Sequence, residues 1–489
     1  MNRRILFLLL VTVMMAAGGC KKFLDQAPDS TRTQLDSPEK VAQLLGTAYP
    51  QSNYITFAEA MSDNVADKGP DKGILTLVNR DPFYFEDVKD NQQDSPEAYW
   101  AACYTAIAAA NQALEACEKA TNPEAYAAQR GEALVARAYS HFMLVNFFSK
   151  FYDSTTAATD PGIPYVTVPE TVVFKPYDRG TVKQVYDLVE KDLLEGMTML
   201  RDDEYAVPRY HFTQTAAHAF ASRFYLYKRN YQKVLEHAEK SIMGNTISEY
   251  LRPWNTKYST MTYEELWDLY TSAEEPANLL LVETLSEYGR SCPLFRYGMD
   301  YARQQEIFSS AQLTNASATW AYSILYYGEP NYFVPKFLEY FVKTSVNANI
   351  GYPHIMMPLF TAEEVLFNRA EANTFLGNTS QAISDLNLFA SKRIRNYSTA
   401  SHTITTTKLK NYYGTSDIKL ATLVAILDFR RSEYVQEGMR WFDILRYKLP
   451  VEHRDREGEV VASLASDDLR KVLQMPESVK TSGLPMNPR

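Results

Sequence analysis

Residues 130–153 read RGEALVARAYSHFMLVNFFSKFYD, and the spacing of their apolar side chains predicts an α-helix. Steps of three and four residues separate the members of one apolar face, which are Val135, Ala138, Tyr139, Phe142, Val145 and Phe148. This is the period of a helix, whereas a half-buried strand would alternate at every second residue. We therefore expect a helix with one buried face.

The same helical period recurs along most of the chain. It is found in residues 96–120, 181–200, 213–242, 361–393 and 420–447. Thr181 precedes one of these runs and Gln184 follows three residues later, which is the spacing of a capping box at the start of a helix. The fold is therefore expected to be mainly α.

Two of the helical segments share an internal pattern of helix, turn and helix. Arg229 in the first turn corresponds to Gly377 in the second, and Val234 corresponds to Ala382 at identical spacing. The pattern is that of a tetratricopeptide repeat, in which a small residue after the turn lets the paired helices approach closely. Such pairs cannot bury their faces singly, so we expect a tetratricopeptide-like α/α superhelix.

The pattern changes between about residues 244 and 360, where stretches such as ILYYGEPNYFVPKF mix proline, glycine and aromatic residues. The run NLLLVET at 278–284 is typical of a buried strand. We expect a long, irregular, loop-rich insertion that carries short strands, and such an interruption is where a repeat scaffold usually places its binding surface. A shorter irregular stretch, residues 61–87, is expected to join it.

The N-terminus, MNRRILFLLLVTVMMAAGGCKKFLD, reads as an export signal, with two arginines, an apolar run and small residues before Cys20. The apolar run is too short to cross a bilayer. The small residues followed by Cys20 resemble a bacterial lipobox, in which cleavage exposes a cysteine that carries a diacylglyceryl group. We expect residues 1–19 to be a lipoprotein signal peptide, Cys20 to carry lipid, palmitate included, and residues 20–489 to form one domain. An ordinary signal peptide is the alternative, because Ala17 stands where leucine is usual.

The composition argues against several kinds of partner and site. The formal net charge is −9, which disfavours nucleic acid and anionic lipid headgroups by repulsion. Cys103, Cys117 and Cys292 are too few for a disulfide framework or a zinc site, and the first two lie in helical patterns as packing residues. Tyrosine, with 34 residues, outnumbers phenylalanine, with 24, and offers a flat apolar face with a hydroxyl for packing or for polar ligands.

The sequence contains no GxSxG, HExxH, glycine-rich phosphate loop or CxxC. His218 and His237 lie within paired helices, where packing is the simpler role. The stretch DNVADKGPDKG from Asp63 resembles a calcium loop only superficially, because Val65 and Lys68 replace an oxygen ligand and the turn glycine. It predicts a solvated turn, with a loose metal site as the alternative. We therefore expect no catalytic residue, cofactor or metal.

Several stretches, taken in order, resemble the SusD/RagB family over nearly the whole mature chain. They are CKKFLDQAP, GIPYVTVPE followed by RGTVKQVYDLVEKDL, AEANTFLGN and RRSEYVQEGMRWFDILRYK. The last is the most specific. It places a set of charged residues around Trp441 and Phe442, and the resemblance implies that this frame is structural: Arg430, Arg431, Glu433, Glu437, Arg440 and Asp443.

The resemblance implies a surface-exposed outer-membrane lipoprotein that binds a nutrient, most often a glycan. The implied partner is a SusC-like TonB-dependent transporter, to which the glycan is delivered. A peptide-binding member of the family is the main alternative. An anchored glycoside hydrolase and a scaffold that binds only protein are the others, and the missing catalytic motifs disfavour the hydrolase.

Aromatic residues of the irregular stretches are the candidate ligand contacts, because sugar rings stack on flat side chains while polar groups meet the hydroxyls. We expect Tyr84, Tyr288, Tyr297 and Trp320 to bind the ligand. Packing beneath a long loop is the alternative role for each of them. Trp100 and Trp441, which lie in helical patterns, are expected to be structural.

Overall fold

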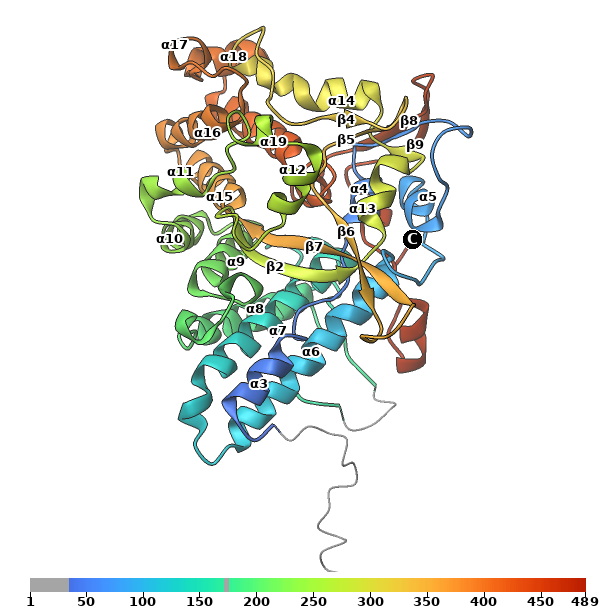
Figure 1. Ribbon diagram of the computed structural model, residues 1–489, viewed down its shortest axis with the longest axis vertical. Coiled ribbons are helices and arrows are strands. Elements are labelled where there is room, and N and C mark those ends of the chain that lie inside the picture. Colours follow the sequence, from blue (N-terminus) through green and yellow to red (C-terminus); the bar gives the residue numbers. More distant parts are fainter. Residues whose placement is uncertain (1–34, 171–175) are drawn as a thin grey trace, which may run out of the picture.

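The computed structural model describes residues 35–170 and 176–489, and helices dominate it (Figure 1). The helices are α3 (Pro38–Leu45), α4 (Ile55–Met61), α5 (Leu77–Phe83), α6 (Pro96–Lys119), α7 (Ala127–Phe148), α8 (Val182–Met197), α9 (Gln214–Tyr227), α10 (Tyr231–Ser241), α11 (Ile247–Tyr250), α12 (Tyr263–Tyr270), α13 (Tyr288–Ser291), α14 (Tyr301–Phe308), α15 (Ala362–Phe375), α16 (Thr379–Arg393), α17 (Thr399–His402), α18 (Thr406–Tyr413), α19 (Ile418–Glu433) and α20 (Met439–Tyr447). The strands are β1 (Ala66–Asp67), β2 (Asn278–Leu285), β3 (Tyr297–Gly298), β4 (Leu325–Tyr326), β5 (Tyr332–Phe333), β6 (Glu339–Lys343), β7 (Gly351–Thr361), β8 (Val451–Arg454) and β9 (Val460–Leu464). The predicted signal peptide, residues 1–19, and Cys20 lie outside the described residues.

The stretch 130–153 forms most of α7, which packs between α6 and α8. The predicted apolar face is buried, but the expectation of a single buried face is too narrow, because every side chain from Gly131 to Phe148 is buried. Close approach to α8 depends on two glycines. A Cβ atom on Gly131 would lie 2.9 Å from the carbonyl oxygen of Gly196, and one on Gly196 would lie 2.7 Å from that of Gly131.

The two predicted repeat units are the helix pairs α9–α10 and α15–α16, and α10 packs against α15. Their turns are equivalent, since Arg229 has φ of 59° and Gly377 has φ of 82°, both left-handed. Val234 and Ala382 are both fully buried where the paired helices meet. The structure therefore confirms the mainly α prediction and the correspondence between the turns. It also contains the capping box of Thr181 at the start of α8.

The helical period of residues 420–447 does not correspond to a single helix, because α19 and α20 are separate. Gln436, with φ of 66°, and Gly438, with φ of 72°, turn the chain between them. Their backbone N–H groups donate to the two carboxylate oxygens of buried Glu59, on α4, at 2.8 and 3.1 Å. A contact with a distant segment therefore fixes a break that local spacing does not indicate.

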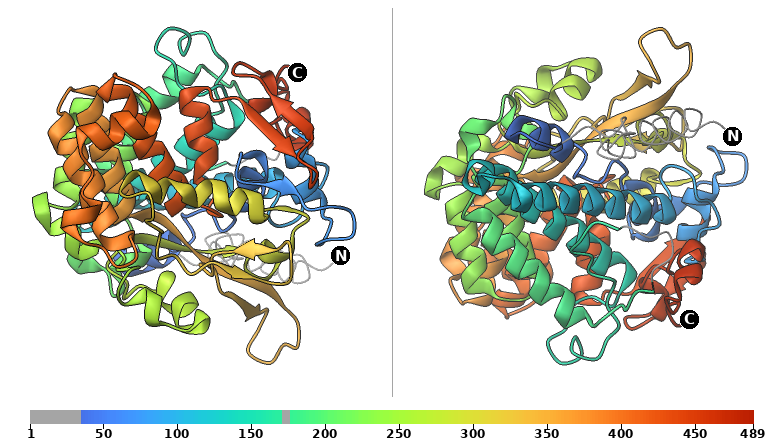
Figure 2. Two further views of the ribbon diagram at one scale, coloured as in Figure 1. Left: turned by 90° about the horizontal axis from the view of Figure 1, so that it is seen from above. Right: turned by 90° about the horizontal axis from the view of Figure 1, so that it is seen from below.

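The insertion contains an antiparallel sheet with the strand order β2-β7-β6. Strand β2 confirms the strand predicted at 278–284, and its side chains are mostly buried. The sheet crosses the middle of the molecule in Figure 1, and the β6–β7 hairpin projects from the body in both views of Figure 2. The remaining strands form two-stranded pairs.

The irregular stretch 61–87 joins the insertion, as expected. Strand β1 pairs antiparallel with β3, with Asp67 opposite Tyr297. Farther along, the N–H group of Ile74 donates to the carbonyl oxygen of Leu294 at 2.6 Å. Two segments more than 200 residues apart in the sequence thus form one surface.

The interpretation of the Asp63 stretch as a solvated turn is wrong for residues 63–69, which are buried or half-buried. Asp63 accepts hydrogen bonds from Arg440 at 2.8 Å, and Asp67 accepts two from Arg296 at 2.7 Å. Burial raises the pKa of the Asp63 carboxyl, but the guanidinium groups of Arg431 and Arg440 outweigh this effect and hold that pKa well below its usual range. These carboxylates form internal ion pairs with arginines from other elements.

One connected cluster of buried apolar side chains extends from Val41 to Leu484. Trp100 and Trp441 belong to it, with 6% and 0% of their surfaces exposed, as their predicted structural role requires. Cys103 and Cys117 are buried in it as unpaired packing residues. Within residues 35–170 and 176–489, no helix is both long enough and apolar enough to span a bilayer.

Candidate functional site

Four tyrosines of α14 and the β4–β5 hairpin are named here together as the tyrosine patch: Tyr301, Tyr326, Tyr327 and Tyr332. The first three expose 59%, 67% and 67% of their surfaces. The ring of Tyr332 lies 5.9 Å from that of Tyr301 and 6.1 Å from that of Tyr326. The patch offers flat apolar faces next to phenolic hydroxyls at the surface, which suits a ligand that is apolar on its faces and polar at its edges.

The hairpin that carries three of these rings is short and tightly bonded. Tyr326 pairs with Tyr332 across the two strands. At the turn, the N–H group of Tyr327 donates to the carbonyl oxygen of Asn331 at 2.8 Å. The N–H group of Asn331 donates to the carbonyl oxygen of Gly328 at 2.9 Å. Gly328 has φ of 69°, a left-handed conformation that glycine adopts without steric cost. The ring positions therefore depend on what holds this turn in place.

Helix α14 begins and ends with polar contacts that fix it to the body. Asp300 caps its first turn by accepting a hydrogen bond from the N–H group of Arg303 at 2.8 Å. Near its last turn, Glu306 accepts a hydrogen bond from Arg431 of α19 at 2.8 Å. The patch is thereby connected to the C-terminal frame.

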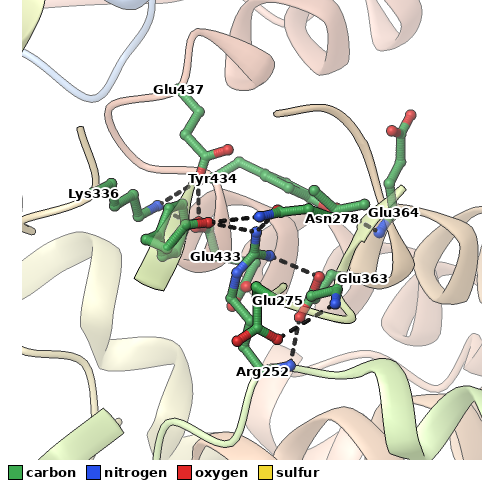
Figure 3. A network of polar contacts seen from close by, with 12 residues as sticks. Arg252, Glu275, Asn278, Lys336, Glu363, Glu364, Glu433, Tyr434 and Glu437 are labelled. Carbon is green, nitrogen blue, oxygen red and sulfur yellow. Dashed lines mark hydrogen bonds and ion pairs between the residues drawn. The ribbon is translucent and has the colours of Figure 1, made fainter. Parts of the chain in front are cut away.

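That frame extends into a buried ionic network (Figure 3). Glu433 accepts a hydrogen bond from Arg393 at 2.9 Å, and Glu437 accepts one from Lys336 at 2.7 Å. Arg393 also donates to Glu363 at 2.8 Å, and Lys336 donates to the carbonyl oxygen of Glu433, so the pairs form one chain of contacts. Burial raises the pKa of the Glu433 carboxyl, but the positive charges of Arg393 and Lys336 outweigh this effect, so the pKa is lowered. Because these charges neutralise one another away from solvent, the network is structural, as the family resemblance implies.

The structure brings together two of the four predicted ligand residues, Tyr84 and Tyr297. Their rings meet edge to face at 5.6 Å, and Tyr297 stacks on Phe83 at 4.3 Å. Tyr297 is 3% exposed, whereas Tyr84 is half-buried. Phe85, the next residue, lines a cleft of about 510 Å³ that is bridged by an ion pair between Arg489 and Asp87. Tyr84 is therefore the member of the pair that a ligand can reach.

The other two predicted residues lie elsewhere in the core. Tyr288 is 2% exposed, and its hydroxyl donates to the carbonyl oxygen of Gln436 at 3.0 Å. Trp320 is 5% exposed, and its indole N–H donates to the hydroxyl of Ser310 at 3.1 Å. The surfaces of both rings are covered by protein, so the geometry supports the packing role for them.

None of the four members of the tyrosine patch is among the residues that the sequence analysis predicts to bind a ligand. They lie in the predicted irregular insertion, and the stretch YYGEPNYF carried a usable signal in its Gly-Glu-Pro-Asn turn between two aromatic pairs. Such a pattern is typical of a hairpin whose short strands project from the body.

Among the described residues, no group of three or more histidine, cysteine, aspartate or glutamate side chains is placed to hold a metal ion. His218 and His237 face each other across α9 and α10, with their Nδ1 atoms 2.9 Å apart. Burial, aided by the other imidazole, lowers the pKa of His218 to about 4, and burial lowers that of His237 to about 4. They form a neutral hydrogen-bonded pair that joins two helices, which fits their predicted packing role.

Solved structures with similar folds cover nearly the whole chain. A putative sugar binding protein from Bacteroides vulgatus has a TM-score of 0.70 at 21% identity, covering 94% of this chain and 99% of its own. A SusD superfamily protein from Bacteroides thetaiotaomicron has a TM-score of 0.66 at 20% identity, covering 93% and 100%. A SusD-like carbohydrate binding protein from Bacteroides vulgatus has a TM-score of 0.64 at 16% identity, covering 91% and 96%. These likenesses show the fold.

Family models identify both halves of the chain. Residues 22–226 match a model described as starch-binding associating with outer membrane, and residues 295–468 match the model of the SusD family. No curated protein is similar enough in sequence to count as a relative. The two matches leave out mainly the variable stretch between them, and together they cover more than half of the sequence. The chain therefore belongs to the SusD/RagB family.

Proposed function

We propose that this chain is a cell-surface lipoprotein that binds a neutral oligo- or polysaccharide at the tyrosine patch. The patch itself is the observation that carries the proposal, because three rings from two adjacent elements expose well over half of their surfaces. Exposed aromatic surface does not stabilise the unbound protein, whereas the C–H groups of a sugar ring can cover the faces of these rings when a glycan binds. The sugar-binding descriptions of relatives with this fold support the same class of ligand.

Two carboxylates beside the patch favour a neutral ligand. Asp300 lies one residue before Tyr301, and Glu329 lies at the exposed tip of the hairpin. Carboxylate oxygens accept hydrogen bonds from sugar hydroxyls and repel uronic acid or sulfate groups. We therefore expect affinity that depends little on salt, unlike that of a charged ligand.

Calorimetry with neutral oligosaccharides, acidic oligosaccharides and peptides tests the assignment. Tyr301→Ala, Tyr326→Ala and Tyr327→Ala should each weaken binding of a neutral glycan about tenfold, which corresponds to about 1.4 kcal/mol. Tyr84→Ala belongs in the same panel. Tyr352→Ala is the matched control, because this ring is 58% exposed on β7, away from the patch.

Three outcomes would redirect the proposal. Binding of peptides without any glycan would support the peptide-binding alternative. Loss of binding in Tyr352→Ala alone would move the site to the β6–β7 hairpin. Release of new reducing ends from a bound polysaccharide would support an anchored hydrolase, although we expect none because no catalytic motif is present in the sequence.

We further propose that residues 20–489 act as one domain, held to the outer membrane by lipid on Cys20, which passes glycan to a SusC-like TonB-dependent transporter. The matching family model is described as starch-binding associating with outer membrane, and this description supports the proposed location. A tether keeps the local concentration of the two partners high. Solubilisation in mild detergent should recover a TonB-dependent transporter with the chain, and recovery of the chain alone under every mild condition would argue for a free-standing binder.

A further inference from the structure

Lys68 is a buried lysine without a carboxylate partner, and it lies behind the tyrosine patch. Its side chain comes from the residue after β1 and is 1% exposed. Its ammonium donates to Oδ1 of Asn331 at 2.6 Å and to the carbonyl oxygen of Pro293 at 3.4 Å. It forms no ion pair with any carboxylate of the described residues. A buried charge held only by neutral acceptors is costly, so its location calls for a reason.

Asn331 connects this ammonium to the turn that positions the patch. While Oδ1 accepts from Lys68, Nδ2 donates to the carbonyl oxygen of Tyr327 at 3.2 Å. The backbone of Asn331 is also bonded to both Tyr327 and Gly328. The side chain thus joins the lysine to Tyr327, and the backbone of the same residue holds Gly328.

The backbone around Lys68 is itself fixed to the strand before α14. Its N–H group donates to the carbonyl oxygen of Arg296 at 3.1 Å, and β1 pairs with β3. Gly298 of β3 lies against the lysine, and a Cβ atom there would be 3.4 Å from Nζ. The base from which Lys68 reaches the hairpin is therefore rigid, and the same base leads directly into Tyr301.

We propose that Lys68 is a positioning residue for ligand binding, whose ammonium holds Asn331 and thereby fixes the β4–β5 hairpin in the arrangement that forms the tyrosine patch. This inference rests on the proposed function of the patch. Lys68 touches no ligand and acts only through Asn331.

The charge state of Lys68 gives the proposal a distinctive signature. Burial lowers the pKa of the ammonium to about 8, while Cys292 and Asp300 oppose the shift. The thiol of Cys292 stays neutral, because burial raises its pKa to about 12. On the adjoining strands, Asp67 is paired with Arg296.

The consequence for stability has a definite sign. The unfolded chain keeps its lysine proton up to about pH 10.5, the ordinary value, so it binds more protons than the folded chain between pH 8 and 10.5. Stability therefore rises with pH across that window, and at neutral pH the charged lysine opposes folding. Any buried lysine would give this stability profile, so the dependence of glycan affinity on pH is the readout that distinguishes a positioning role.

Lys68→Met tests the proposal because it keeps the stem and removes the ammonium. We expect a melting temperature that is unchanged or higher, faster hydrogen exchange in residues 325–333 and glycan affinity at least tenfold lower. Wild-type affinity should fall between pH 7 and 9, and this dependence should be absent from the variant. Asn331→Ala should lose affinity to the same degree, and the double variant should lose no more than either single one, because both act through one contact.

Lys72→Met is the matched control, since Lys72 lies in the same stretch but is partly exposed and faces Asp71 at 3.6 Å. Unchanged affinity and exchange in Lys68→Met would overturn the inference. So would an affinity loss accompanied by a proportional fall in melting temperature. If the wild type binds no glycan, the proposed function fails, and the exchange measurement still decides whether Lys68 fixes the hairpin.

Discussion

Arg431 Nη1 donates to Glu306 Oε1 at 2.8 Å and joins the C-terminal frame to the helix that carries Tyr301. The same guanidinium donates through Nε to Asn64 at 2.9 Å and through Nη2 to the carbonyl oxygen of Asp63 at 2.7 Å. One side chain therefore holds three segments that are far apart in the sequence. Its contacts are with the scaffold rather than with a ligand surface.

Replacing Arg431 with Met should lower the free energy of unfolding by about 1–3 kcal/mol, because buried acceptors lose their donors. Glycan affinity should also fall, since α14 is released at Glu306. Urea unfolding and calorimetry measure the two effects. Arg290→Met is the control, because Arg290 forms only exposed ion pairs, for which about 0–1 kcal/mol is expected. Equal stability of the two variants would contradict the prediction.

Trp441→Ala and Trp100→Ala should each cost about 3–5 kcal/mol, because both indoles are buried in the main core. The Phe substitutions should cost less, since they refill part of the space. Chemical denaturation measures the loss. Melting temperatures that do not change in either Ala variant would show that these side chains are not structural.

Acid should destabilise the protein in part through His141. Burial lowers the pKa of this imidazole to about 3. Its Nε2 accepts a hydrogen bond from the N–H group of Val166 at 3.0 Å, and its Nδ1 lies 2.9 Å from the carbonyl oxygen of Arg137, an arrangement that suits the neutral ring. The unfolded chain binds a proton near pH 6.5, so stability is full above that value and falls as pH decreases toward 3.

The expected slope from this one residue approaches about 1.4 kcal/mol per pH unit below pH 6. Urea unfolding at pH 7, 6 and 5 measures it. His141→Gln should be less stable at pH 7 and should lose less stability on acidification than the wild type. Parallel slopes for the two proteins would contradict the assignment of this loss to His141.

The two repeat turns should respond differently to substitution. Gly377→Ala should cost about 1–2 kcal/mol, because an L-residue is strained at φ of 82°. Arg229→Gly relieves similar strain but removes a hydrogen bond from Nη2 to the carbonyl oxygen of Arg446 at 3.3 Å. We therefore expect a change of about 1 kcal/mol or less. Thermal unfolding compares them, and a larger loss for Arg229→Gly would mean that its contact outweighs the strain.

Cys20→Ala should abolish lipid attachment and leave the chain unprocessed or soluble. Metabolic labelling with a radioactive fatty acid, followed by fractionation, measures both properties. Cys117→Ala is the control, since Cys117 is a buried packing residue. Labelled fatty acid on the Cys20→Ala chain would mean that the anchor lies elsewhere.

The sequence predicts those parts of the fold that depend on local spacing. The helix pairs, the cap at Thr181 and strand β2 follow from the period of apolar residues and from capping chemistry. The match between Arg229 and Gly377 was visible because two equivalent turns lie at equal distances from their helices. Even the irregularity of residues 244–360 was apparent from composition.

Long-range contacts determine what local spacing could not reveal. Glu59, 377 residues earlier, bonds the break at Gln436, and Tyr288 is buried against Phe337 and bonded to Gln436. For an aromatic residue in an irregular stretch, exposure is decided by neighbours that come from other elements. Trp320 and Tyr326 show this difference, because they lie in the same insertion but are 5% and 67% exposed.

The segment from Glu306 to Val334, which carries the β4–β5 hairpin of the tyrosine patch, is anchored to the frame at both ends. Glu306 is held by Arg431, and the N–H group of Val334 donates to Oε1 of Gln436 at 2.9 Å. The anchoring residues lie five positions apart on the chain, so the intervening segment begins and ends at almost the same place. A change confined to the exposed β4–β5 hairpin would therefore leave both anchors, and the helical body behind them, in place.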